Sequence, residues 1–372
     1  MFDVICLGIL VADVIARPVD RLPKVGTLAA VDLISLRGGG CALNTSSALG
    51  RLGLHTAVVG KVGADPFGDF LLGLLEQRSV DAAGVRRDPT LPTSASVVCV
   101  DTAGERTFLH LTGANAGLRA DEIGDGVFHC RALHLAGALV LDALDGEPAA
   151  ALLAEAQLRG IHTSLDTAFD PSGRWERVLP SLPHCHLVTP DLNEAQAITG
   201  EEEPARAARR MRELGATEVA VTLGRDGCYL ASERFDGHVP GFTVQTLDGT
   251  GAGDAFAAGL LHARLAGWPL ERAARSANAA GALATTAVGA FEGVGDLAAT
   301  LDLAEANTDA VKNRPGDSGL RSSSHAATSI SCSSYGTGTG RKHGPGATYF
   351  RTMRCTPGMK WSLAANWRST LG

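Results

Sequence analysis

The chain has 372 residues, of which 45% are hydrophobic and 20% are charged, and its formal net charge is -7. This composition excludes a wholly disordered chain and predicts a sizeable hydrophobic core, in one large domain with an accessory element or in two domains. The net negative charge, with no Lys/Arg cluster on an expected helix of the main body, argues against nucleic acid as a partner.

The N-terminal segment MFDVICLGILVADVIA is mostly apolar but includes Asp3 and Asp13 and has no basic region. It therefore predicts a buried strand and not a signal peptide. No stretch of 18 uncharged apolar residues occurs, so we expect no membrane span. The eight cysteines are spaced singly, which is typical of free thiols in a reducing cytoplasm, and a cytoplasmic location is expected.

Short apolar runs alternate with helix-like stretches from about residue 45 to residue 300. This alternation is typical of βα units, which build a parallel sheet covered by helices on both faces. Apolar residues recur at helical spacing in 67–80 and 146–160. The expected strands of this sheet are 3–9, 56–62, 132–137, 162–167, 186–190 and 218–224. The sequence therefore predicts an α/β fold with a mostly parallel central sheet.

Two segments, at about residues 12–38 and 93–113, interrupt this alternation. The second contains two β-rich runs on either side of an Asp-Thr-Ala-Gly-Glu turn, which predicts a hairpin. We expect the two segments to form a small antiparallel sheet that stands off the main domain and closes a cleft as a lid.

The composition changes after about Ala304. Residues 305–372 contain nine Lys/Arg and three Asp/Glu, are rich in Ser, Thr and Gly, and show no apolar periodicity. A disordered tail and a frameshifted end of the gene both explain this stretch, and we assign it no function.

The most informative stretch is LDGTGAGDAFAAGLL, residues 247–261, in which a glycine-rich turn runs into an apolar helix. Gly251, Ala252 and Gly253 are expected at the helix N-terminus, where free backbone N–H groups and the helix dipole favour an anionic phosphate. Asp254 follows directly. An aspartate here either caps the helix or serves as a base that deprotonates an attacking hydroxyl, and the residues alone leave both readings open.

This stretch resembles the C-terminal signature of the PfkB (ribokinase) family of carbohydrate kinases, DTxGAGDxFxxG. The resemblance implies that Gly251, Ala252 and Gly253 form an anion hole and that Asp254 is the general base. It also implies that Asp248 and Thr250 help to hold a monovalent cation, for which K⁺ is the candidate. Gly249 departs from the usual Thr or Pro.

A second motif, GGGCALNTSSALGRLG at 38–53, is similar to the family's N-terminal element GGxxxNxAxxxxxLG. It implies that Gly39, Gly40 and Asn44 contact a sugar, since an amide both donates to and accepts from hydroxyls; as an isolated residue, Asn44 would equally suit a helix cap. LGILVAD at 7–13 resembles LGxxxxD, whose Asp, here Asp13, anchors sugar hydroxyls. Ribokinase has GGKGAN where this chain has GGCALN, so ribose is not the expected substrate.

Further motifs resemble the family's nucleotide and metal sites. VTPDLNEAQAITG at 188–200 resembles the segment with an Asn-x-x-Glu motif, and implies that Glu194 and Asp191 handle Mg²⁺ through water. A helix N-terminal turn rich in acids is the alternative. VTLGRDGCYL at 221–230 resembles the family's TLGxxG turn and implies that Thr222, Gly224 and Gly227 contact ATP, whereas a plain strand-turn-strand explains the glycines equally well. Asn278 is the other candidate ATP residue. The second cation loop is expected at Ala284, Gly289 and Gly293.

The resemblance extends over about residues 3–300, so residues 1–304 are expected to form a ribokinase-like three-layer domain with a small β-sheet lid. It implies an ATP- and Mg²⁺-dependent sugar kinase that phosphorylates a primary hydroxyl. A nucleoside kinase of the same family and a catalytically impaired sugar- or nucleotide-binding protein are the alternatives. A homodimer formed through the lid is expected, because the lid sheet would otherwise expose apolar residues such as Val97 and Phe108 to solvent.

Overall fold

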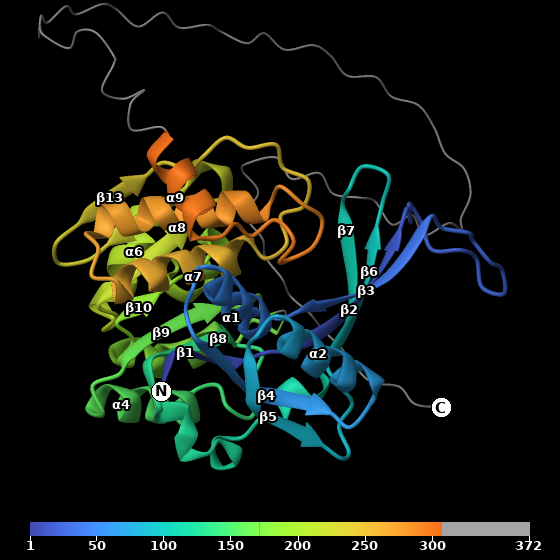
Figure 1. Cartoon of the computed structure of the whole chain (residues 1–372), viewed down its shortest axis with the longest axis horizontal. Helices are drawn as coiled ribbons and strands as arrows, with labels where there is room; N and C mark the ends of the chain where they lie inside the picture. The colour runs from blue at the N-terminus through green and yellow to red at the C-terminus, as the bar shows by residue number, and fades with distance from the viewer. Residues whose placement is uncertain (171, 307–372) are drawn as a thin grey trace, which may run out of the picture. The chain divides into compact units, whose positions relative to one another are not determined.

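The computed structural model describes residues 1–170 and 172–306 (Figure 1). Of the segment 305–372, for which a disordered or frameshifted tail is predicted, residues 307–372 lie outside the described part. In that described part no helix is long and apolar enough to cross a membrane.

A nine-stranded sheet forms the centre of the fold, in the order β13-β12-β11-β10-β9-β8-β1-β4-β5. The pairs from β11 to β5 are parallel, and β12 and β13 add an antiparallel edge. The bounds are β1 Phe2–Gly8, β4 Thr56–Gly63, β5 Asp81–Asp88, β8 Cys130–Ala138, β9 His162–Thr167, β10 Leu187–Val188, β11 Glu218–Thr222, β12 Cys228–Ala231 and β13 Asp236–Val239. The six expected strands are present. The edge strand β5 was not predicted, because DAAGVRRD has neither an apolar run nor a clean alternation.

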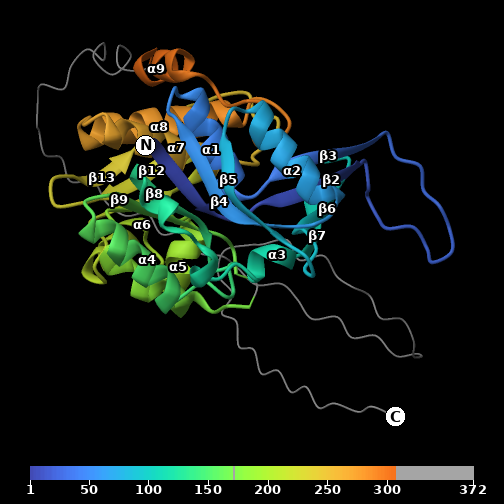
Figure 2. The same cartoon turned by 60° about the horizontal axis from the view of Figure 1, so that its bottom comes forward.

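Helices cover both faces of this sheet, which confirms the predicted three-layer α/β fold. Figure 2 shows α1, α7 and α8 on one side of the sheet and α4, α5 and α6 on the other, and each layer packs on its own apolar core. The helices are α1 Cys41–Arg51, α2 Pro66–Gln77, α3 Gly113–Ala116, α4 Glu147–Leu158, α5 Leu192–Thr199, α6 Pro204–Glu213, α7 Ala252–Leu265, α8 Leu270–Ala284 and α9 Leu297–Ala306. The 3-10 helices are η1 Ala120–Glu122, η2 Asp125–Phe128, η3 Trp175–His184 and η4 Gly224–Asp226.

A second sheet of four strands stands off the main one, in the order β3-β2-β6-β7 (Figure 1). Its strands are β2 Val11–Arg17, β3 Leu33–Gly39, β6 Ala95–Val100 and β7 Arg106–Leu111. The predicted antiparallel arrangement is wrong in one pair, because β2 and β6 are parallel. The reason is that β2 follows β1 and β6 follows β5, and these parallel strands end at the same edge of the main sheet, so both successors leave it in one direction.

The register of the small sheet separates its two faces. Asp13 pairs with Arg37 and Ser96, and Ser96 pairs with His110, so these four residues form a row on one face. The opposite face carries exposed apolar side chains: Ile34, Leu36, Val97, Leu109 and Leu111. The first face is joined to the main domain by two ion pairs, Arg37–Glu292 and Arg106–Asp248.

Candidate active site

Asp254 lies in the first turn of α7, where the glycine-rich turn positions it. Gly251 precedes the helix with φ 76°, a left-handed conformation that favours glycine, and a Cβ there would collide with the Ala290 backbone. Ala252 and Gly253 begin the helix. The Ala252 N–H makes a long bond of 3.4 Å to the Gly249 carbonyl, and within the described residues no backbone bond is found for the Gly253 N–H at this helix N-terminus. The residues of the predicted anion hole thus lie at the N-terminus of α7, with the Asp254 carboxylate in the same turn.

Helix α1 brings Asn44 to Asp254. Gly40 precedes α1 with φ 90°, which leads the chain directly from the small sheet into the helix. The Asn44 Nδ2 atom donates to Asp254 Oδ2 at 2.8 Å. The predicted sugar-contact amide and the predicted base, 210 positions apart in the sequence, are thus direct neighbours. Asn44 caps no helix, which removes the alternative raised for it.

A second carboxylate, Asp166 at the end of β9, lies beside Asp254 and was not predicted as a site residue. Ligand atoms of Asp166, Asp254 and Cys41 all lie within 4.8 Å of one another. Asp166 accepts from the Gly137 N–H at 2.5 Å. Burial, and then the charge of Asp166, raise the pKa of Asp254 well above that of an ordinary aspartate, and the hydrogen bond from Asn44 offsets part of this. A carboxylate with a raised pKa is a stronger base, as a general base requires.

Asp13 lies on the small sheet, on the face that forms ion pairs with the main domain. A Cβ at Gly39 would overlap Asp13 Oδ2, so glycine is required for the carboxylate to lie there. Burial raises the pKa of Asp13 to about 6, against a hydrogen bond from Ser96. Ser96 Oγ also hydrogen-bonds His110 Nδ1 at 3.1 Å, and burial lowers the pKa of His110. The row thus offers a carboxylate, a hydroxyl and an imidazole to a polyhydroxylated ligand.

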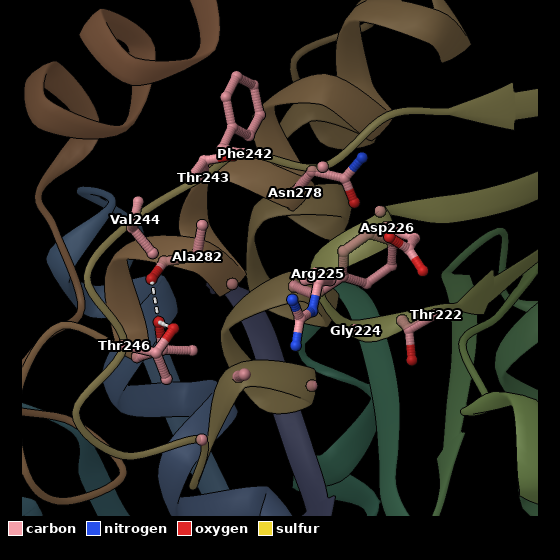
Figure 3. A pocket seen from close by; sticks show the side chains of 18 residues that line it. Thr222, Gly224, Arg225, Asp226, Phe242, Thr243, Val244, Thr246, Asn278 and Ala282 are labelled. Atoms are coloured by element: carbon pink, nitrogen blue, oxygen red, sulfur yellow. Dashed lines mark hydrogen bonds between the residues drawn. The ribbon is translucent and has the colours of Figure 1, made fainter.

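The candidate ATP residues line one cavity of about 710 Å³ (Figure 3). Thr222, Gly224, Gly227 and Asn278 share it with Ala252 and Gly253, so the nucleotide candidates and the anion hole open into the same space. Asn278 Nδ2 donates to the backbone carbonyls of Val239 and Pro240, so its amide holds the cavity wall in place. The sequence did not predict the wall formed by residues 241–246, which includes the following side chains: Phe242, Thr243 and Val244.

The two predicted cation-loop segments lie together around Asp248. Its carboxylate accepts from Thr250 N and Oγ1 and from the Gly289 N–H, and Arg106 of β7 lies 3.0 Å away. Arg106 also hydrogen-bonds the Thr250 hydroxyl. These donors outweigh partial burial and lower the pKa of Asp248. A Cβ at Gly293 would meet the Ala284 carbonyl at 2.5 Å, so glycine allows the second loop to close.

Glu194 and Asp191 form a capping box at the start of α5. Asp191 Oδ1 accepts from Glu194 N at 2.8 Å, and Glu194 Oε2 accepts from Asp191 N and Thr167 Oγ1. Burial, and then the charge of Asp191, raise the pKa of Glu194 to about 7. Within the described residues these bonds leave Asp191 Oδ2 and Glu194 Oε1 without a donor, as a hydrated Mg²⁺ ion would require. The geometry is therefore compatible with both interpretations of these two residues, a helix cap and a site for hydrated Mg²⁺.

The family model of the pfkB family carbohydrate kinases matches residues 1–294 of this chain. This match establishes the family to which these residues belong. The chain belongs to the pfkB family. This carbohydrate kinase is 31% identical over 318 residues to fructokinase-1 of Zea mays, covering 77% of this chain and 95% of the relative. It is 32% identical over 300 residues to an ATP-dependent ribose-1-phosphate kinase of Halopiger xanaduensis, covering 78% and 94%.

A solved structure of similar fold is a ribokinase II of E. coli in complex with ATP and Mg²⁺. It superposes on the kinase with a TM-score of 0.70 at 23% identity, over 82% of this chain and 99% of that chain. At this identity the similarity establishes the fold alone.

Two of the residues that were not predicted, Asp166 and Cys41, carry a recognisable signal in the sequence. Asp166 ends a buried parallel strand, and polar residues at the carboxyl ends of such strands commonly face ligands. Cys41 lies inside the N-terminal motif. Arg106 and His110 had no comparable signal, because only the pairing of β6 with β7 turns both toward the main domain.

Proposed function

We propose that this carbohydrate kinase transfers the γ-phosphoryl group of ATP to a primary hydroxyl of a sugar, with Asp254 as the general base. The observation that carries the proposal is the place of Asp254, between the cavity that contains Gly253 and the Asn44 amide. In this proposal Asn44 and Asp13 hold the hydroxyl, with the base on one side of it and the phosphate on the other. Residues 1–304 are the proposed kinase domain.

The chemical step follows from these positions. Asp254 removes the hydroxyl proton as the oxygen attacks the γ-phosphorus, and the amides of residues 251–253, at the positive end of the α7 dipole, stabilise the charge on the transferring phosphoryl group. ATP lies across the cavity from Asn278 toward Gly253. Glu194 and Asp191 are the proposed residues that would hold the water shell of Mg²⁺, which would neutralise charge on the phosphates. The small sheet excludes water that would otherwise accept the phosphoryl group.

Arg106 argues against a strict requirement for a monovalent cation at the Asp248 loop. In K⁺-dependent relatives, as the resemblance implies, a cation lies near the residue equivalent to Asp248, whose carboxylate here already faces a guanidinium. We infer that Arg106 supplies a positive charge at this loop and that K⁺ adds to activity without being required for it.

A nucleoside is the second candidate substrate, favoured by Phe108. This residue lies two positions before His110 on β7, hence on the face that carries Asp13, and its side chain is 54% exposed. An exposed aromatic ring over a substrate cleft can stack on a base.

We also propose that the kinase dimerises through the apolar face of the small sheet. The face carries Leu36, Val97 and Leu109 in one row, a surface that a monomer rarely leaves open. Replacing Leu109 by Asp should convert a dimer to a monomer in sedimentation analysis, whereas a wild-type monomer would exclude the proposal. The six described cysteines are free, which supports a cytoplasmic location.

The function is tested by coupled ADP release with pentoses, hexoses, sugar phosphates, sugar acids and nucleosides. One compound should give turnover that Asp254→Asn lowers by about a hundredfold or more. Phe108→Ala separates the candidate substrates, since it should weaken a nucleoside far more than a free sugar. Binding of ATP and sugar without turnover in the wild type would reject the kinase step and leave a binding protein.

A further inference from the structure

Three side chains that can bind a metal ion lie close together beside Asn44. Cys41 contributes a thiol from the first position of α1, and Asp166 and Asp254 contribute carboxylates from β9 and α7. Their ligand atoms all lie within 4.8 Å of one another. In a tetrahedral zinc site, with bonds of about 2.0–2.3 Å, the ligand atoms lie roughly 3.3–3.8 Å apart. Small side-chain rotations therefore bring these three atoms to metal-binding distances.

Two buried polar atoms beside this cluster have no hydrogen-bond partner within the part of the chain that the structure describes. His134 is 0% exposed, its Nδ1 bonds Ser164 Oγ at 2.8 Å, and its Nε2 has no hydrogen bond among the described residues. That Nε2 lies 3.8 Å from Asp166 Oδ2, so it points toward the cluster. The Asn44 Oδ1 atom, on the amide that binds Asp254, is likewise buried and without a partner. Unsatisfied buried polar atoms are costly, and a cation beside Asp166 would accept the lone pair of His134 Nε2 in the Nδ1–H tautomer.

We propose that Cys41, Asp166 and Asp254, with His134 as a neighbouring nitrogen donor, bind a thiophilic divalent cation such as Zn²⁺, and that this ion inhibits the kinase. Binding forms metal–sulfur and metal–oxygen bonds, and the thiol proton leaves to solvent. A sulfur ligand selects Zn²⁺ or Cd²⁺ over Mg²⁺ and Ca²⁺, which prefer oxygen.

The dication also relieves the repulsion between the two carboxylates, whose oxygen atoms lie within 4.8 Å of each other. Inhibition follows because a coordinated Asp254 cannot accept a proton from the substrate. The metal and the sugar are expected to compete, since both need Asp254 and the space beside Asn44. Metal binding itself does not depend on the proposed kinase reaction, but the inhibition does.

The binding is tested on the full chain with Cd²⁺ alone, without nucleotide or sugar, by titrating the ultraviolet absorption of the Cd–thiolate bond. The wild type should bind one equivalent more than Cys41→Ser, and Cys99→Ser, which removes a thiol from the small sheet, should match the wild type. Asp166→Asn should weaken the site by about tenfold or more. Equal stoichiometry in wild type and Cys41→Ser would reject the site, whatever the variants do to activity.

A second measurement uses only the wild-type chain and so does not depend on how a variant folds. N-ethylmaleimide modification of Cys41 is followed by mass spectrometry with no metal, with Zn²⁺ and with Mg²⁺. Zn²⁺ should slow the modification of Cys41 by about tenfold or more while Mg²⁺ leaves it unchanged. Equal protection by both ions, or none by Zn²⁺, would overturn the proposal. Protection without inhibition of ADP release would retain the metal site and reject only its effect on catalysis.

Discussion

Asp248 and Asp254 lie six positions apart on one glycine-rich turn, yet their environments shift their pKa values in opposite directions. Asp248 accepts hydrogen bonds from Thr250 and Gly289 and faces Arg106, and its pKa is lowered. Asp254 receives a bond from Asn44 but is desolvated and faces Asp166, and its pKa is raised. The residue type is the same, so the surroundings determine the chemistry of each.

The comparison separates a structural carboxylate from a reactive one. A carboxylate held by several donors is a weak base that fixes loops in place, whereas one whose ionised form is poorly solvated accepts a proton readily. The two aspartates should therefore respond oppositely to substitution by Asn, in activity and in stability.

The largest effect is expected for the pair Asp254→Asn and Asp248→Asn. Asp254→Asn should lower kcat by about a hundredfold or more, because the base is lost. Asp248→Asn should lower it by less than about tenfold, because that carboxylate only orders the loop. Steady-state kinetics on the substrate identified by the panel measures both, and equal losses would contradict the assignment of Asp254 as the base.

Thermal unfolding should show the reverse order. At pH 8, above its raised pKa, Asp254 is ionised and its burial beside Asp166 destabilises the fold, so Asp254→Asn should raise Tm. This gain should shrink as the pH falls, since the wild-type carboxylate then takes up a proton. Asp248→Asn should lower stability by roughly 1 kcal/mol, through loss of donors to a charged acceptor. A lower Tm in both variants would show that the two carboxylates do not differ in this way.

The sequence predicts the local part of this site but not the residues that reach it from distant strands. The turn around Gly251, the helix that follows it and the position of Asp254 depend on neighbours in the chain, so the sequence was sufficient. Asp166 and Arg106 reach the turn from β9 and from β7, and their proximity depends on strand order and on how the small sheet lies over the main one. A pattern of short range cannot encode such distant pairs, which also explains why the parallel pairing of β2 and β6 was missed.

Removing the guanidinium that faces Asp248 tests the role of Arg106. Arg106→Met should lose about tenfold in activity without K⁺ and regain most of it when K⁺ is added, because a free cation can then approach the carboxylate. Arg37→Met is the matched control, since it breaks the other ion pair between small sheet and main domain but leaves Asp248 untouched. A K⁺ response that is the same in both variants would indicate loss of sheet docking and not of a local charge.

Asp13, like Asp254, has a raised pKa, but it has no proposed role in proton transfer. Its pKa of about 6 means that it is ionised above pH 6 and protonated below. Since the carboxylate is the proposed acceptor for sugar hydroxyls, the Kd of the sugar should rise by about tenfold from pH 7 to pH 5. Calorimetric titration measures this directly. Asp13→Asn should bind weakly at both pH values, and a wild-type Kd that is independent of pH would place the sugar elsewhere.

The smallest effect is expected at Asp191, whose two proposed tasks can be separated by substitution. Asn and Asp are equally good helix caps, so Asp191→Asn should leave stability unchanged, whereas Asp191→Ala should cost about 1 kcal/mol. Asn removes the negative charge near the water shell of Mg²⁺, so this variant should need a few-fold more Mg²⁺ for half-maximal activity. A Mg²⁺ requirement that changes only in the Ala variant would make Asp191 a cap alone and leave Glu194 as the residue that handles the metal.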